Sequence, residues 1–170
     1  MRVFFALWPD DNIRQALVEA QSAVHGLAGG RRMRTETLHL TLVFIGDVAC
    51  ERLPDLLRTA GNVRTAAFEF SLDLLEFWRR NRIAHLGASV TPGPLSGLVT
   101  RIESGLMALQ IPFDQRPYVP HVTLVRNLDC AKGNPAWPPV TWPVRDFVLV
   151  RSSLRPEGAR YEQLGRWPLL

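Results

Sequence analysis

The pattern of apolar and polar positions divides the chain into two similar halves. Residues 2–7 and 82–90 are apolar runs of the length of a β-strand. Each run precedes a segment in which apolar residues recur every three or four positions, as on one face of a helix. These residues are Ile13, Leu17, Ala20 and Val24 in the first half, and Leu95, Leu98, Ile102, Leu106 and Leu109 in the second. A further strand-like run follows each segment, so each half is predicted to form a strand–helix–strand unit.

Capping and turn-forming residues set the limits of these elements. Asp10 or Asp11 can cap the first helix, which Gly29-Gly30 ends, while Pro94 begins and Pro112 stops the second. We expect two α+β lobes around one cleft. Within the lobes, the pattern favours antiparallel pairing of the strands at least as much as parallel pairing. The pattern also predicts a short helix from residue 51 to about 60, strands over 68–75 and 147–154, a turn at 156–158, a last short strand near 161–164 and a long loop over 127–143.

One short motif occurs in both halves. His39-Leu-Thr-Leu42 recurs as His121-Val-Thr-Leu124. Because side chains alternate between the two faces of a strand, His39 and Thr41 project together, and so do His121 and Thr123. If the halves are related by an approximate two-fold axis, two imidazoles and two hydroxyls surround one small volume in the cleft.

This set of groups suits displacement at phosphorus. Histidine titrates near neutral pH, so a pair can hold one neutral base and one protonated acid at the same time. Threonine hydroxyls can donate hydrogen bonds to the non-bridging phosphate oxygens. The sequence therefore predicts acid–base catalysis by His39 and His121 with Thr41 and Thr123 on the phosphate, and nothing in the set demands a metal or a cofactor.

Two other interpretations stay open at this point. A single His-x-Thr on a strand is usually structural. His39 and His121 can also bind a metal ion, with His85 or a carboxylate as the third ligand. Because two copies stand near equivalent places of a half-chain repeat, we rank acid–base catalysis above both.

Composition narrows the setting without identifying a substrate. The chain has 170 residues, 46% of them hydrophobic, so we predict a single domain over residues 1–170 with a substantial core. No apolar run approaches a membrane span, and the N-terminal run meets Pro9 too soon for a signal-peptide core, so the predicted location is the cytoplasm. The net charge is +4, and all the basic residues except Lys132 are arginines. Arginine suits phosphate, but this modest charge does not by itself indicate RNA.

Several segments together resemble one family. The repeated His-x-Thr strands resemble the 2H phosphoesterase superfamily, which is named for two such motifs. A closer likeness, to the bacterial and archaeal RNA 2′,3′-cyclic phosphodiesterases, also called 2′-5′ RNA ligases, spans almost the whole chain. It rests on Arg2-Val-Phe-Phe-Ala-Leu7, Leu38-His-Leu-Thr-Leu-Val-Phe-Ile-Gly46, Arg116-Pro-Tyr-Val-Pro-His-Val-Thr-Leu-Val-Arg126 and Leu154-Arg-Pro-Glu-Gly-Ala-Arg-Tyr161.

The resemblance implies a fold and a reaction. The fold is bilobal and pseudo-symmetric, each lobe an antiparallel sheet backed by outer helices, with the active cleft between them. The reaction is metal-independent hydrolysis of the 2′,3′-cyclic phosphate at an RNA end, tRNA fragments being one candidate, and it leaves a 2′-phosphate. The ligase name of the family implies, in addition, a weak joining of RNA ends through a 2′-5′ linkage. This is formally the reverse chemistry, with an RNA 5′-hydroxyl in place of water. We expect no membrane partner and a monomer.

The resemblance also suggests roles for individual residues. It makes His39 the proton donor to the 3′ oxygen and His121 the base that deprotonates water. Arg126 matches a basic position of the family, although strict alternation places it opposite His121 unless the strand ends or bulges there. The remaining substrate-binding candidates are Thr41 and Thr123 on the phosphate, Arg116 as a second cation or a structural ion pair, and Phe5 or Tyr118 as an aromatic that stacks on the base.

Two alternative functions accompany this interpretation. One is a related phosphodiesterase that acts on a small cyclic nucleotide or on ADP-ribose cyclic phosphate. The other is an RNA-binding module without turnover, which the presence of both His-x-Thr pairs argues against.

Overall fold

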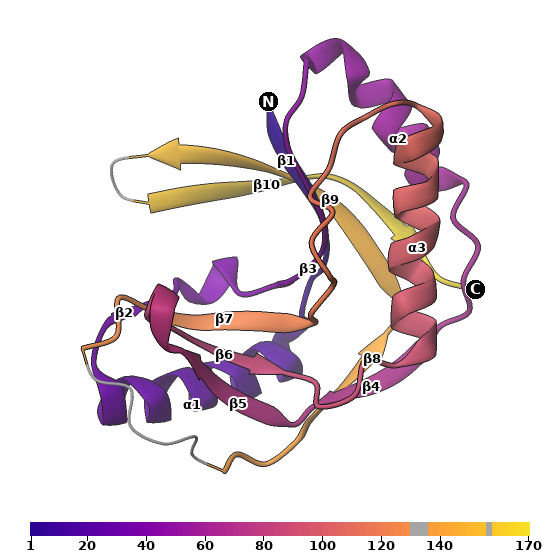
Figure 1. The fold of residues 1–170 in the computed structure, drawn as a ribbon. Helices are drawn as coiled ribbons and strands as arrows, with labels where there is room; N and C mark the ends of the chain where they lie inside the picture. Colours follow the sequence, from indigo (N-terminus) through magenta and orange to yellow (C-terminus); the bar gives the residue numbers. More distant parts are fainter. Residues whose placement is uncertain (130–135, 156–157) are drawn as a thin grey trace.

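The computed structural model describes residues 1–129, 136–155 and 158–170 (Figure 1). The helices are α1 (Asp11–Ala28), α2 (Leu53–Gly61) and α3 (Gly93–Ala108), with short 3₁₀ turns η1 (Thr35–Thr37), η2 (Cys50–Arg52) and η3 (Arg79–Asn81). The strands are β1 (Arg2–Leu7), β2 (Arg31–Arg32), β3 (Leu40–Asp47), β4 (Phe68–Leu72), β5 (Leu74–Trp78), β6 (Ile83–Gly87), β7 (His121–Arg126), β8 (Val140–Val144), β9 (Asp146–Arg155) and β10 (Gly158–Pro168).

The main sheet has the strand order β10-β9-β1-β3-β7-β6-β5, with β2 paired to β7. Every pairing is antiparallel, and β4 and β8 form a separate two-stranded sheet. The register between β3 and β7 consists of one pair, Leu40 with Val122. The main sheet therefore separates at this point into two lobes, which Figure 1 shows diverging on either side of β3 and β7.

The lobes are not the two halves of the sequence. Helix α1 follows β1 in the chain but packs against β6, β7 and β8, whereas α2 and α3 pack against each other and against β10 and β3 respectively. Strands β9 and β10, from the end of the chain, complete the lobe that holds β1 and β3. The α+β class and the two antiparallel lobes around a cleft are confirmed, but each lobe draws elements from both halves.

Local sequence explains the limits of the helices. The Asp10 side chain accepts a hydrogen bond from the backbone N–H of Ile13, at 2.9 Å, and so caps α1. Gly29 ends that helix with a φ of 61°, a positive value that favours glycine. Helix α3 begins at Gly93, one residue before Pro94, and ends at Ala108. Its predicted apolar face is buried at Leu95, Leu98, Ile102 and Leu106.

Three predicted elements were wrong in part. The single strand expected over 68–75 is two strands in different sheets, because the carboxylate of Asp73 accepts bonds from the backbone N–H and the hydroxyl of Ser89 at the break. The expected loop over 127–143 contains most of β8, where Val140 and Trp142 alternate into the core. The last strand runs over residues 158–168 rather than 161–164. The turn predicted at 156–158 falls largely outside the described residues.

The hydrophobic core extends through both lobes. Leu40, Val122 and Leu124 belong to one cluster that reaches β1, β8 and β9 as well as all three helices. A second, small cluster lies on the other face of β1 and β9, where Phe4, Ala6, Val148 and Val150 pack against partly buried Trp8, Phe44 and Tyr161. This second face is the one that meets the cleft.

Candidate active site

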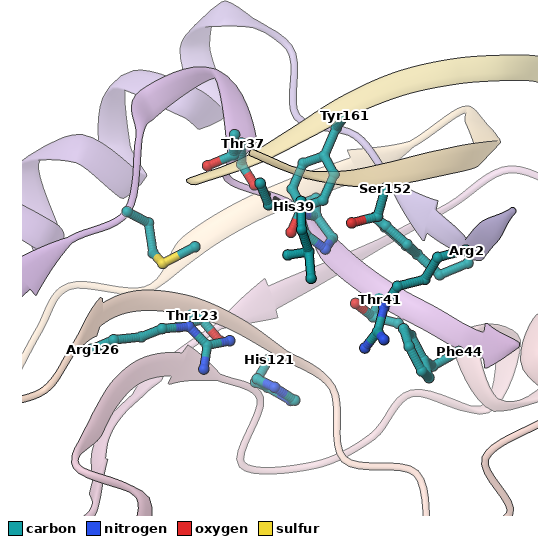
Figure 2. A pocket seen from close by; sticks show the side chains of 14 residues that line it. Arg2, Thr37, His39, Thr41, Phe44, His121, Thr123, Arg126, Ser152 and Tyr161 are labelled. Carbon is teal, nitrogen blue, oxygen red and sulfur yellow. Dashed lines mark hydrogen bonds between the residues drawn. The ribbon is translucent and has the colours of Figure 1, made fainter. Parts of the chain in front are cut away.

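A cavity of about 330 Å³ lies between β3 and β7, where the lobes separate. Figure 2 shows His39 and Thr41 from one lobe and His121, Thr123 and Arg126 from the other around this cavity. The structure thus brings together five of the eight residues predicted to form the site. The described residues that line it are Arg2, Phe4, Met33, Thr37, His39, Thr41, Phe44, His121, Thr123, Arg126, Ser152, Leu154, Ala159 and Tyr161.

The two histidines have matching backbone partners. Nδ1 of His39 lies 2.7 Å from the carbonyl oxygen of Thr37, and Nδ1 of His121 lies 2.7 Å from that of Val119. A carbonyl oxygen can only accept, so each Nδ1 carries the proton and donates it. In its neutral form each ring then has an unprotonated Nε2. Both imidazoles are held in the tautomer that leaves Nε2 available as a base, or as an acid once it is protonated.

A β-bulge turns Arg126 into the cavity. Ala84 of β6 pairs with Val125, but the next residue, His85, pairs with Thr123, so Leu124 is the extra residue of β7. The extra residue shifts the alternation of side chains, and Arg126 joins His121 and Thr123 among the lining residues. This bulge is the feature on which the predicted contact of Arg126 depended.

Strand β3 contains the same irregularity at the same distance from its histidine. Phe5 pairs with Val43 and Ala6 pairs with Thr41, so Leu42 is the extra residue. Phe44 consequently lies on the cavity side, five residues after His39, as Arg126 lies five residues after His121. The guanidinium of Arg2 lies over the Phe44 ring, 4.9 Å from its centroid.

Aromatic rings surround His39. The Trp8 ring is stacked on it at 5.5 Å with an interplanar angle of 8°, and Phe4 and Tyr161 lie at 4.8 and 5.2 Å between ring centroids. Burial lowers the pKa of His39 to about 4; the hydrogen bond to Thr37 opposes this shift, and the charges of His121 and Arg126 add to it. His39 is therefore neutral near pH 7 in the protein alone.

His121 lies in a different setting. Trp78 and His85 approach its ring at 4.6 and 5.5 Å between centroids. Burial also lowers the pKa of His121, opposed by the hydrogen bond to Val119 and assisted by the charge of Arg126. Both imidazoles are thus held toward the neutral form beside a cation.

The cavity favours an anion. Arg2 and Arg126 line it, no acidic side chain is among the described lining residues, and neither arginine forms an ion pair within the described part of the chain. The hydroxyls of Thr41 and Thr123 have no hydrogen-bond partner among the described residues either. Two donating hydroxyls and two guanidinium groups can therefore bind the oxygens of a phosphate.

Sequence comparison places these features in a family. The family model for LigT-like phosphoesterases matches residues 7–85. The RNA 2′,3′-cyclic phosphodiesterase of Escherichia coli is 32% identical over 99% of this chain and 96% of its own length. That of Thermus thermophilus is 35% identical over 99% of this chain and 90% of its own. The chain belongs to the LigT-like phosphoesterase family.

A solved structure agrees with the sequence relationship. E. coli LigT in complex with 3′-AMP superposes with a TM-score of 0.82 and 31% identity, covering 99% of this chain and 97% of that one. The matches to full-length relatives include both His-x-Thr strands, although the LigT-like family model itself reaches only the first.

The prediction that Phe5 stacks on the terminal base was wrong. It is fully buried on the core face of β1, against Phe147 and Trp167 at 6.1 and 6.4 Å between ring centroids, so it cannot touch a substrate. The neighbouring residue Phe4 lines the cavity instead. The motif has two consecutive phenylalanines, and the register of β1 decides which of them faces the cleft.

Arg116 and Tyr118 lie outside the cavity between the histidines. Arg116 is exposed and its Nε lies 2.9 Å from both carboxylate oxygens of Asp114, which is the ion pair that the sequence left as an alternative. Both residues line an adjoining second cavity. That Tyr118 stacks on a base therefore stays a prediction.

Sequence reasoning missed Arg2, Phe44, Ser152 and Tyr161, all of which line the cavity. Two signals pointed to Arg2 and Phe44. Alternation along β1 places Arg2 on the same face as Phe4, and the spacing between the two motifs makes Phe44 the counterpart of Arg126. Tyr161 and Ser152 come from β10 and β9, whose contact with the first strand is a long-range pairing that local patterns do not carry.

The described residues do not support the alternative of a metal site at the two histidines. No group of three His, Cys, Asp or Glu side chains there is arranged to hold a metal ion. His85, the third ligand of the alternative metal site, is almost fully buried, and its Nε2 lies 3.4 Å from a carboxylate oxygen of Glu76. Among the described helices, none is long and apolar enough to cross a membrane.

Proposed function

We propose that this protein hydrolyses the 2′,3′-cyclic phosphate at an RNA end, without a metal ion, and leaves a 2′-phosphate. The observation that carries the proposal is the pair of histidines, each fixed through Nδ1 to a backbone carbonyl, on either side of a cavity with two arginines. The names of the two full-length relatives and the 3′-AMP bound by E. coli LigT support RNA ends as the substrate class. The proposal includes action as a monomer in the cytoplasm, on ends such as those of tRNA fragments.

The reaction follows from two opposed imidazoles. Nε2 of His121 accepts a proton from a water molecule, whose oxygen forms the new bond to phosphorus. The bond from phosphorus to the 3′ oxygen breaks, and Nε2–H of His39 protonates that oxygen. Thr41, Thr123 and Arg126 hold the non-bridging oxygens while charge develops on them. One proton enters at His121 and one leaves at His39, so a proton exchange with solvent completes the cycle.

Substrate binding supplies the protonated acid. In the protein alone, burial and the charge of Arg126 both lower the pKa of His39. A bound cyclic phosphate places a negative charge beside the imidazole and offsets Arg126, so it raises the pKa of His39. His39 is thereby protonated, and can act as the acid, when the anionic substrate is bound.

Three histidine variants test the proposal. His39→Ala and His121→Ala each remove a proton-transfer group and are expected to lower kcat by about 10²–10⁴-fold on an RNA that ends in a cyclic phosphate. His25→Ala is the matched control, because His25 is an exposed residue of α1 that does not line the cavity. Circular dichroism should show all three folded.

Two further conditions complete the experiment. Addition of EDTA should leave the rate unchanged, and strong inhibition that a divalent ion reverses contradicts the metal-independent mechanism. A comparison of an oligonucleotide with a cyclic mononucleotide and ADP-ribose cyclic phosphate separates RNA from small substrates. Tight binding of the RNA without turnover indicates a binding module instead.

A further inference from the structure

Exposed arginines gather at the end of β7 where Arg126 enters the cavity. Arg126 pairs with Arg31 of β2 on one side and with Ile83 of β6 on the other. The turn η3, which contains Arg79 and Arg80, leads into β6 at this end, so β2 and η3 flank the same end of β7 (Figure 1). Arg31, Arg79 and Arg80 are all exposed. Together they form a basic surface at the edge of the cavity.

The strand register determines the direction of the Arg31 side chain. Residues paired directly in an antiparallel sheet have their side chains on the same face. Arg31 therefore points to the face on which Arg126 lines the cavity, and Met33, two residues after Arg31, lines it as well. Arg32 lies on the opposite face, where its guanidinium donates a hydrogen bond to the hydroxyl of Ser22 on α1, at 2.9 Å. Arg31 thus lies on the cavity side of the sheet, beside Arg126.

Backbone contacts hold both basic segments against β7. The N–H of Met33 donates to the carbonyl oxygen of Leu124 at 2.9 Å, and the N–H of Leu128 donates to that of Arg82 at 3.2 Å. Nε of Arg82 also donates to the carbonyl oxygen of Leu128, at 2.8 Å. The backbone of β2 and of the η3 turn is therefore fixed relative to the cavity, which reduces the ordering that a ligand must impose when it binds.

The three arginines of the basic surface have free guanidinium groups. Within the described residues, none of them forms an ion pair or a side-chain hydrogen bond. The carboxylate of Asp129 lies 3.9 Å from Arg82 rather than beside one of the three. The basic surface is therefore available to an anionic ligand.

Arg31 and Arg126 place two positive charges at paired positions of a sheet. Such a pair is destabilising by itself, and neither residue has an acidic partner in the described part of the chain. Bound phosphate removes this repulsion, and its oxygens match the planar fork of a guanidinium. Since Arg126 faces the cavity and Arg31 lies at its edge, the pair suits two phosphates in succession.

We propose that the RNA strand leading to the cyclic phosphate runs from the cavity across the end of β7. Its last internal phosphate binds Arg31, and earlier phosphates bind Arg79 and Arg80. This assignment rests on the proposed function, which places the cyclic phosphate between the two histidines. It adds that the preferred substrate is an RNA strand rather than a small cyclic nucleotide. Contacts to phosphates carry no sequence information, so the preference is for chain length and not for particular bases.

The test varies the number of internal phosphates in the substrate. A cyclic mononucleotide with a 5′-hydroxyl has none, a dinucleotide with a 2′,3′-cyclic end has one, and a longer oligonucleotide with the same end has several. Values of kcat/KM are measured for the unaltered protein, for Arg31→Gln and for the double variant of Arg79→Gln and Arg80→Gln. The matched control combines Arg64→Gln and Arg101→Gln, because both residues are exposed, form no ion pair within the described residues and do not line the cavity.

Each variant should lose activity only on substrates that reach the altered arginine. For Arg31→Gln, kcat/KM should fall about three- to tenfold on the dinucleotide and on the oligonucleotide. For the double variant of Arg79 and Arg80, a loss of similar size should occur on the oligonucleotide alone. On the mononucleotide all variants should stay within about twofold of the unaltered protein, which also shows that the catalytic cavity is intact in each of them.

The dependence on salt gives a second measurement. Binding of a phosphate by arginine releases counterions, so the kcat/KM of the unaltered protein on the oligonucleotide should fall as the salt concentration rises. The slope of log kcat/KM against log salt should become shallower by about 0.7 for each phosphate contact that a variant loses. The control variant should retain the slope of the unaltered protein.

Three results overturn the basic surface as the path of the RNA. The first is an equal kcat/KM of the unaltered protein on the mononucleotide and the oligonucleotide. The second is a loss in Arg31→Gln that is as large on the mononucleotide as on the dinucleotide, because Arg31 then acts on the cyclic phosphate itself. The third is an equal loss in the control variant, which indicates an effect of net charge. Absence of hydrolysis of all three substrates, by contrast, contradicts the proposed function.

Discussion

Leu40 pairs with Val122, and this register pair is the one that joins β3 to β7 in the described residues. Leu40 directly follows His39, and Val122 directly follows His121. Both apolar side chains are fully buried, while the two histidines face the cavity. The junction of the lobes therefore sets the relation between the two imidazoles.

The first prediction concerns this junction. Leu40→Ala removes a fully buried side chain from the core that both lobes share, so it should lower the free energy of unfolding by about 2–5 kcal/mol. Leu27→Ala, on the exposed side of α1, should change it by no more than about 0.5 kcal/mol. Urea unfolding followed by fluorescence and circular dichroism measures both.

The same unfolding curves test the domain organisation. We propose that residues 1–170 form a single domain, because one hydrophobic cluster extends through both lobes. The two probes should then report one coincident transition. Two separate transitions, one of them insensitive to Leu40→Ala, contradict this organisation.

The second prediction concerns stability at acid pH. Burial lowers the pKa of His39 and of His85 to about 4, against an ordinary value near 6.5 in the unfolded chain. Between these values the unfolded chain binds protons that the folded chain does not. Above about pH 7 these two histidines should not affect the free energy of unfolding. As the pH decreases toward 4, the free energy of unfolding should fall, and at pH 5.5 each histidine should have lowered it by about 1 kcal/mol.

A variant of His85 separates its contribution. His85→Gln removes one of the groups that must remain neutral, so its stability should decrease less steeply between pH 6.5 and 4.5 than that of the unaltered protein. The charge of His121 adds to the effect of burial on the pKa of His85, whose Nε2 lies 3.4 Å from a carboxylate oxygen of Glu76. Parallel pH profiles for the two proteins contradict the prediction.

The third prediction concerns Arg126. Arg126→Gln removes a guanidinium that the β7 bulge turns toward the phosphate site, and kcat/KM for the cyclic phosphate should fall by about 10–100-fold. The loss of a cation that lowers the pKa of both histidines should also move the acid limb of the pH–rate profile to higher pH. Arg116→Gln is the control, since Arg116 is exposed and paired with Asp114; an equal loss in both variants places the phosphate elsewhere.

Much of the site could be predicted from the sequence because its signal is local and repeated. Alternation along a strand places each histidine beside its threonine, and the structure shows this arrangement on β7 and at the start of β3, which His39 directly precedes. The positions of Arg126 and Phe44 in the cavity depend on a bulge in each strand, which shifts the alternation of side chains. The pattern of apolar and polar residues does not indicate these bulges. The prediction that Phe5 contacts the substrate was wrong because both faces of β1 are apolar. The residue pattern alone therefore does not distinguish the core face from the cleft face.

The elements of the fold were easier to predict than their partners. Helix α1 has a cap, an apolar face and a terminal glycine, and these are properties of its own residues. That α1 packs against the lobe of β7 rather than against β1 follows from long-range contacts, as does the pairing of β9 with β1. The Trp142-Pro143 pair predicts a turn rather than the strand β8, yet Pro143 lies on the exposed side of this short strand, where a missing N–H is tolerated.

The central claim is that two fixed histidines open a cyclic phosphate at its 3′ bond. The most direct measurement is to incubate an RNA that ends in a 2′,3′-cyclic phosphate with the protein and to map the phosphate of the product. The account predicts a 2′-phosphate, formed by the unaltered protein and lost with His39→Ala or His121→Ala. A product with a 3′-phosphate, or a cyclic end that persists through long incubation, contradicts it.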